Sequence, residues 1–450
     1  MTQRKATYVR ASALAAAVSM LCAANAHAET DKEKELESRI QQLEKKLEEM
    51  SQAKAPAATA PTPPPPPPAP TAGAIQAKSI TPNAMPNTRF SFTGFIKLDT
   101  MLSKYEDGEI ADGSVGRDFY LPGTIPVGGA DESADWDMHA KQSRFILGTD
   151  TELADKSVLS SRLEFDLYGS ALGDERATNT YGLQLRHAYL QYKGWLVGQT
   201  WSNFQDVAAL PESADFIGPT DGTIFVRQPQ IRYTTGAFSI AVENPETTIT
   251  PFGGGTGGNA RISSDDNNIP DVTAAYTFKF GSSYIRASAL ARQLKYQTTG
   301  VGAIDDSTYG GALSISGKIM LGTADDLRFM ATAGDGIGRY VGVNFANDAV
   351  LNASGDLKAI SGWAAFAAWR HVWTPKLRST LMVSTSEYDN DVALTGGGVN
   401  KSSFSWAANM FYSPIPKIDV GVELRHAERE VESGVDGAMN RLHAAVKYSF

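Results

Sequence analysis

Hydrophobic and polar residues alternate with a period of two over most of the chain from Phe90 onward. This alternation is typical of β-strands that have one apolar face. The pattern predicts sixteen strands, at 90–102, 141–152, 157–168, 182–192, 194–201, 223–233, 237–243, 271–279, 283–294, 308–317, 326–334, 357–372, 376–387, 401–412, 417–428 and 438–450.

The connections between these strands alternate between long and short. Long connections fall at 103–140, 169–181, 202–222, 244–270, 295–307, 335–356, 388–400 and 429–437, and glycine, proline or aspartate marks the short ones. A soluble sandwich would not alternate so strictly. The pattern therefore predicts an all-β fold, a 16-stranded antiparallel transmembrane β-barrel over residues 90–450, with short periplasmic turns and long outer loops.

A short amphipathic helix is expected in the segment 29–52. Its apolar residues follow a 4-3-4-3 spacing, and they are Leu36, Ile40, Leu43, Leu47 and Met50. This spacing is the seam of a coiled coil, so we expect a short N-terminal coiled-coil helix in the periplasm. Fewer than three heptads are marginal, which leaves a lone charged helix as the alternative. A tethered oligomer would raise the effective concentration of the helices.

Residues 53–89 form a Pro/Ala-rich linker that includes the unbroken run Pro63–Pro68. Such a segment favours extended polyproline geometry and acts as a semi-rigid spacer. A docking site for a proline-binding module is the sharper alternative.

The first 28 residues have the three parts of a signal peptide. Arg4, Lys5 and Arg10 precede an apolar stretch, and Ala26-His27-Ala28 fits a cleavage site. The apolar stretch is shorter than the ~20 residues that a spanning helix needs, which disfavours a membrane anchor. The mature chain is then expected to begin at Glu29, outside the cytoplasm.

Cysteine and charge exclude further classes of protein. The single cysteine, Cys22, lies in the signal, so the mature chain has no thiol for a disulfide or a metal site. The signal holds three of the 41 basic residues and none of the 50 acidic ones, which leaves a net charge near −12. This acidity disfavours nucleic acid as a partner.

Parity along the strands predicts which charged side chains line the channel. The inward set is Arg162, Glu164, Arg186, Arg232, Arg286, Arg292, Arg328, Arg378, Glu423 and Arg425. Arginine is a permanent cation whose planar fork matches a carboxylate, so a wall rich in arginine would favour anions. The plainer alternative is that these arginines balance inward acids, because charges are placed inside any wide barrel.

No catalytic, cofactor or metal motif is found. The histidines of the mature chain sit in no recognisable Ser or Asp motif for an activated nucleophile. The run Gly253–Gly258 lacks the Lys-Ser/Thr ending of a phosphate-binding loop, and Asp265-Asp266 lacks the ligand spacing of a calcium site. We expect no enzyme activity, no cofactor and no metal site.

The last strand carries an assembly signal. Leu442, Ala444, Val446, Tyr448 and Phe450 alternate with polar or small residues up to the terminus. An apolar alternation that ends in Phe resembles the signal read by the barrel-assembly machinery, with Tyr448 and Phe450 as its main residues.

The complete layout resembles the DcaP-like family of trimeric outer-membrane porins. The runs that carry the likeness are 92–99 (Phe-Thr-Gly-Phe-Ile-Lys-Leu-Asp), 186–190 (Arg-His-Ala-Tyr-Leu) and 198–204 (Gly-Gln-Thr-Trp-Ser-Asn-Phe). The resemblance implies a homotrimer in the outer membrane of a Gram-negative bacterium, in contact with lipid and lipopolysaccharide. It also implies passive uptake of dicarboxylates and other small anions.

Two points stay open in the sequence. Residues 202–222 either fold into the barrel and narrow it, or cap it from outside. A general, non-selective porin that acts mainly as an envelope tether, with the coiled coil on peptidoglycan, is the alternative to an anion channel.

Overall fold

In a computed structural model of the chain, residues 38–39, 41–42, 45, 87–169 and 178–450 are described. The chain divides into two units, Met1–Ala69 and Pro70–Phe450. The described residues of the first unit are helical and exposed. The predicted signal peptide (1–28), the seam residues Leu36, Ile40, Leu43, Leu47 and Met50, and most of the predicted linker lie outside the described residues.

Sixteen strands of the described residues form one closed antiparallel barrel, as the alternation predicts. They are β1 (Thr88–Tyr105), β3 (Arg144–Glu152), β4 (Val158–Asp166), β5 (Gln184–Tyr192), β6 (Trp195–Trp201), β7 (Arg227–Thr235), β8 (Phe238–Glu243), β11 (Asp271–Phe280), β12 (Ser283–Gln297), β13 (Asp305–Leu321), β14 (Asp325–Asp335), β17 (Ser361–Thr374), β18 (Leu377–Asp389), β19 (Asn400–Tyr412), β20 (Ile418–Val431) and β21 (Asp436–Ser449).

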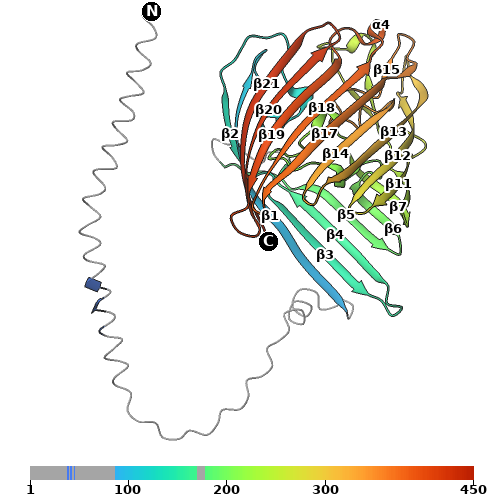
Figure 1. The fold of residues 1–450 in the computed structure, drawn as a ribbon. Coiled ribbons are helices and arrows are strands. Elements are labelled where there is room, and N and C mark those ends of the chain that lie inside the picture. Colours follow the sequence, from blue (N-terminus) through green and yellow to red (C-terminus); the bar gives the residue numbers. More distant parts are fainter. Residues whose placement is uncertain (1–37, 40, 43–44, 46–86, 170–177) are drawn as a thin grey trace, which may run out of the picture. The chain divides into compact units, whose positions relative to one another are not determined.

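The barrel closes between its first and last strands. β1 lies between β3 and β21 (Figure 1). It pairs with β3 through residues 88–95 and with β21 through residues 95–105, where Leu98 lies opposite Val446. In a third pairing of β1, the short strand β2 (Asp135–His139) lies along residues 99–103 and continues the edge that β3 begins. Closure satisfies the backbone hydrogen bonds of the first and last strands, which an open sheet would leave exposed in a membrane.

Three predicted strand boundaries differ from the structure by four residues, and the others differ by less. The strand predicted at 308–317 continues to Leu321, and β7 begins at Arg227 rather than at residue 223. The segment predicted at 357–372 is divided, because Leu357–Ala359 is β16 of a separate sheet and the barrel strand begins at Ser361. Local alternation continues through such breaks, so sequence does not show where a strand leaves the barrel.

Two long loops of the structure, 244–270 and 336–360, together form a small sheet. β9 (Thr247–Thr250) and β10 (Ile262–Ser264) come from one loop, and β15 (Ala349–Leu351) and β16 from another. Ile249 and Ala349, opposite each other in this sheet, pack with Leu294 of β12 into an apolar cluster. The loops at this end of the barrel therefore carry their own packed structure.

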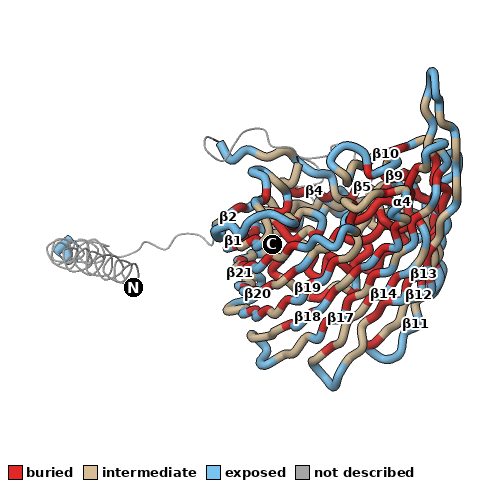
Figure 2. The backbone as a smooth tube through the Cα atoms, turned by 90° about the horizontal axis from the view of Figure 1, so that it is seen from above, coloured by how far each residue is buried: buried red, intermediate tan, exposed pale blue. Residues whose placement is uncertain are grey.

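Burial alternates along the barrel strands with the predicted parity. In β18, Leu381 and Val383 are 55% and 43% exposed, whereas Met382 and Ser384, which alternate with them, are at most 2% exposed. The same change from exposed to buried residues recurs along the strands of the wall in Figure 2. One face of each strand thus presents apolar side chains outward and the other packs inside the barrel. Among the described residues, no helix is long and apolar enough to cross a membrane.

Candidate functional site in the barrel interior

The loop between β6 and β7, residues 202–226 and called here the inner loop, follows the inner wall of the barrel. It is held in turn by β12, β13, β14, β18, β20 and β1. The contacts are Arg286 to Asn203, Ser316 to Asp206, Arg328 to the carbonyl of Leu210, Arg378 to Glu212, Glu423 to Ser213, and Lys97 to the carbonyl of Ala214. A single segment can contact all of these strands only if it lies inside the closed barrel. Of the two positions left open by the sequence, the loop therefore takes the interior one.

The second half of the inner loop is fixed to β17, β18 and β19. The backbone N–H of Gly222 donates to Ser384 Oγ at 2.7 Å, and a Cβ at Gly222 would lie 2.2 Å from the backbone of Ala365. The carboxylate of Asp221 accepts hydrogen bonds from Tyr120 at 2.7 Å and from Ser405. Burial raises the pKa of the Asp221 carboxyl, and these hydroxyls oppose that rise.

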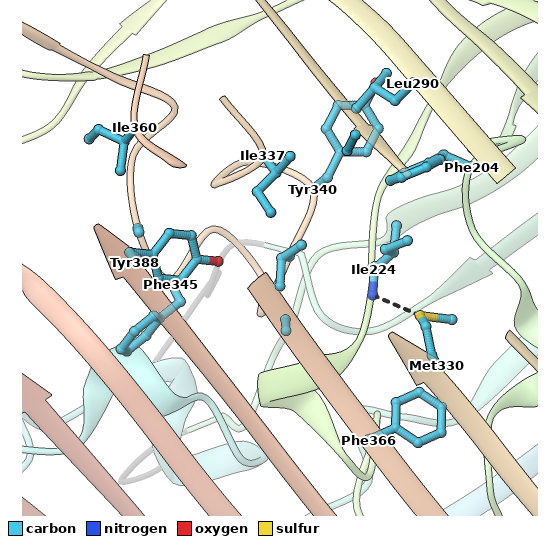
Figure 3. Packing of buried hydrophobic residues seen from close by; sticks show 14 of the residues in the cluster. Phe204, Ile224, Leu290, Met330, Ile337, Tyr340, Phe345, Ile360, Phe366 and Tyr388 are labelled. Atoms are coloured by element: carbon cyan, nitrogen blue, oxygen red, sulfur yellow. Dashed lines mark hydrogen bonds between the residues drawn. The ribbon is translucent and has the colours of Figure 1, made fainter. Parts of the chain in front are cut away.

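An apolar core lies inside the barrel beside this loop. It joins Phe204 and Ile224 of the inner loop to Tyr340 and Phe345 of the 336–360 loop and to side chains of β12, β14, β17 and β18 such as Met330 (Figure 3). Ile224 N–H points at Met330 Sδ at 3.5 Å. The two loops thus fill the part of the interior next to these strands with packed side chains, so a solute must pass elsewhere.

The wall formed by β3, β4 and β5 carries a charged network instead. Arg144 bridges Glu164 at 3.1 Å and Asp166 at 2.8 Å, while Arg162 contacts Glu164 at 2.5 Å and Arg186 contacts Asp166 at 2.7 Å. Three guanidinium groups therefore face two carboxylates, and the wall keeps one excess positive charge.

Most of the other predicted lumen arginines are also paired with acids. Arg328 contacts Asp326 at 2.7 Å. Arg378 contacts Glu212 at 2.6 Å and Asp419 at 2.9 Å. In these two, the alternative that inward arginines balance acids describes the structure well.

Arg292 and Arg425 also form ion pairs with acids, and both side chains are buried away from solvent. Arg292 contacts Asp348 at 2.9 Å, and both side chains are fully buried. Arg425 contacts Glu423 at 2.8 Å, with side-chain exposures of 2% and 1%. These side chains stabilise the interior, and a passing solute does not reach them in this arrangement.

Arg232 and Arg286 differ from the rest of the predicted set. Neither has a carboxylate within 4 Å among the described residues; their guanidinium groups donate instead to neutral oxygens of Gln230, Trp201 and Asn203. They are therefore cations whose charge is not cancelled by a direct ion pair.

Sequence reasoning missed several inward arginines, among them Arg144 and Arg227. The outward Phe145 and Leu147 give the parity that would have placed Arg144 inside. Arg227 begins its strand and lies 3.5 Å from the centroid of the Trp201 ring, a cation–π contact that no strand pattern encodes.

The described residues contain no group of three or more His, Cys, Asp or Glu side chains placed to hold a metal ion. What the interior offers is a series of guanidinium, carboxylate and amide groups around a loop that narrows the barrel. Such groups can bind a charged solute weakly and release it, as a selective pore requires.

A closed sixteen-stranded barrel with an apolar outer face and a loop folded into a charged interior defines a porin-type outer-membrane channel. The family described as DcaP outer membrane protein matches residues 76–450, and the chain belongs to this family. No curated protein matches the chain.

Several solved structures are similar to this chain. The outer membrane channel DcaP of Acinetobacter baumannii is similar with a TM-score of 0.67 and 23% identity, over 81% of this chain and 98% of that one. OmpT of Vibrio cholerae has a TM-score of 0.49 at 13% identity, over 82% and 99% of the two chains. OmpF of Salmonella typhi has a TM-score of 0.49 at 13% identity, over 81% and 98%.

Proposed function

We propose that this outer-membrane channel passes small hydrophilic solutes by passive diffusion and prefers anions, dicarboxylates among them. The observation that carries the proposal is the unequal exposure of unpaired interior charges. Arg232 and Arg286 line a cavity and have no carboxylate within 4 Å among the described residues, whereas Glu243 and Asp206, acids that likewise contact no cation, are only 1% and 7% exposed. A water-filled channel with unbalanced fixed cations concentrates anions along its length.

Reversal potential in a planar bilayer tests the anion preference. With the full mature protein in a KCl gradient, we expect a reversal potential of the sign set by chloride, reduced in size by raising the salt because the fixed charges are screened. Succinate added to one side should reduce the chloride current by occupying the same path. A reversal potential set by potassium would refute the anion preference and leave the channel assignment in place.

We also propose that the protein is a homotrimer. The outer face of β1, β3, β4 and β5 supports this, because it carries a hollow of about 470 Å³ between Phe92, Leu147 and Leu163. Thr149 and Ser161 form a hydroxyl pair at 2.7 Å within that surface, where a lipid-facing wall would place apolar groups. Native mass measurement in detergent should give three copies, and a monomer would contradict the proposal.

The assembly signal and the remaining partners stay proposals. Phe450 packs its ring 5.4 Å from that of Phe92, and Tyr448 is 48% exposed on the outer face, which supports access of assembly machinery to both. Contact with lipopolysaccharide, and a periplasmic coiled coil on peptidoglycan, are further expectations for an outer-membrane barrel with this layout.

A further inference from the structure

A polar cavity lies on the inner wall near the short connections of the barrel. It has a volume of about 630 Å³ and is bounded by β7, β8, β11, β12 and the root of the inner loop. Its polar lining residues include Asn203, Arg232, Ser239, Thr277, Lys279 and Arg286. The turns at Gly236 and Gly281 place this cavity at the end of the barrel that faces the periplasm in outer-membrane barrels.

The two guanidinium groups of the cavity are oriented by hydrogen bonds to the protein, but each keeps free N–H donors. Arg286 donates from Nη2 to the carbonyl of Asn203 at 2.7 Å, and Arg232 donates from Nε to Gln230 at 2.8 Å. In both residues Nη1 makes no hydrogen bond within the described residues, and neither Nη1 is sealed from solvent. Each guanidinium therefore presents donors to the cavity in an orientation fixed by its other contacts.

The nearest carboxylates do not cancel these charges by direct contact. Glu243 accepts from the backbone of Asn203 at 2.8 Å and from Thr273 and Gln228. Asp206 accepts from Ser316 at 2.7 Å and from Tyr284. Both acids take their hydrogen bonds from neutral donors. The cavity has three cations, Arg232, Arg286 and Lys279, which is one more than these two acids.

We propose that Arg232 and Arg286 form a binding subsite for the oxyanion end of a solute, a carboxylate or a phosphate, at the periplasmic end of the pore. This subsite rests on the proposed anion preference, and it locates anion binding at these two arginines. Two preoriented guanidinium groups, each with its Nη1 free, suit planar or tetrahedral oxyanions, and the hydroxyl of Thr277 and the ammonium of Lys279 add further donors. A chloride ion presents a single atom to these directed donors, so the subsite should discriminate oxyanions from chloride.

Block of single-channel chloride current, with either inorganic phosphate or succinate added on the short-connection side, tests the subsite. We expect saturable block by at least one of the two. Arg286→Gln and Arg232→Gln should each weaken it about tenfold, or about 1.4 kcal/mol in binding free energy. Arg286→Lys keeps the charge but loses the planar guanidinium and its fixed orientation, and it should give an intermediate affinity. Whether phosphate, succinate or both block the current identifies which oxyanion the subsite binds.

The matched control is Lys193→Gln. Lys193 pairs with Asp155 at 2.7 Å in a short connection at the same end of the barrel, so this variant removes one positive charge outside the cavity. Its block should equal that of the wild type. Block by neither anion, or equal weakening by Lys193→Gln and Arg286→Gln, would overturn the subsite. Reversal potential measured on the same channels separates the outcomes, because an anion-selective channel without block refutes the subsite and keeps the proposed function.

Discussion

At the scale of single residues, the interior is an arrangement of charges in which pairing matters more than number. Arg378 shows this well, since Nε and Nη2 each lie 2.6 Å from an oxygen of Glu212 and Nη2 also reaches Asp419. A guanidinium held in this way orders the inner loop and contributes little net charge to the pore. The arginines without acid partners are therefore the ones expected to act on solutes.

Glu212→Gln should make the pore more selective for anions. The change removes one negative charge that contacts Arg378, and a unit charge at 4 Å is worth ~1 kcal/mol in water, or about fivefold in local anion concentration. We expect the anion-to-cation permeability ratio from reversal potentials to rise by up to about fivefold.

Glu152→Gln is the control for this variant. Glu152 pairs with Lys156 at the exposed end of β3, away from the inner loop, and its loss should leave the ratio unchanged. A lower ratio in Glu212→Gln would mean that Arg378 does not act on the pore.

At the scale of elements, each strand has a lipid face and an inner face, and the inner loop depends on close contact with the wall. The strands obtain their faces from alternation, because successive side chains point to opposite sides. The inner loop obtains its position from contacts with at least six strands that are distant from it in sequence. These two kinds of element respond differently to mutation.

Leu381→Arg should destabilise the barrel strongly. Leu381 is exposed on the outer face in the middle of β18, where a charge at the bilayer midplane costs ~2–4 kcal/mol. Trp373→Arg, at the end of β17 beside a short connection, should cost ~0–1 kcal/mol because it lies near the interface. Reversible unfolding from lipid vesicles measures both, and equal costs would contradict the assigned lipid face.

Gly222→Ala should loosen the inner loop. Its Cβ would lie 2.2 Å from the backbone of Ala365, so either the loop or β17 must move, at a cost of ~1–3 kcal/mol. We expect a lower free energy of unfolding and noisier open-channel current. Gly123→Ala is the control, since the nearest atom to its Cβ lies at 3.8 Å and its stability should stay within about 0.5 kcal/mol of the wild type.

At the scale of the whole molecule, the barrel is complete within residues 88–449, because β1 pairs with both β3 and β21. Deletion of residues 29–74 should therefore leave the conductance of each channel unchanged in planar bilayers. If the predicted coiled coil joins the protomers, the same deletion should lower the temperature at which the oligomer dissociates on a non-reducing gel. Loss of conductance in the shortened protein would contradict the independence of the barrel.

A structural feature can be predicted from the sequence when it depends on residues that are close together along the chain. The sequence by itself determined the strand number, the lipid-facing set such as Leu381, and the inward parity of Arg286 and Arg378, because apolar and polar residues must alternate when one face meets lipid and the other water. Only the tertiary structure decided that residues 202–226 fold inside, that Arg292 is sealed against Asp348, and that Arg232 and Arg286 lack acid partners. Those facts depend on groups brought together from distant strands, and alternation within a strand carries no information about what lies across the barrel.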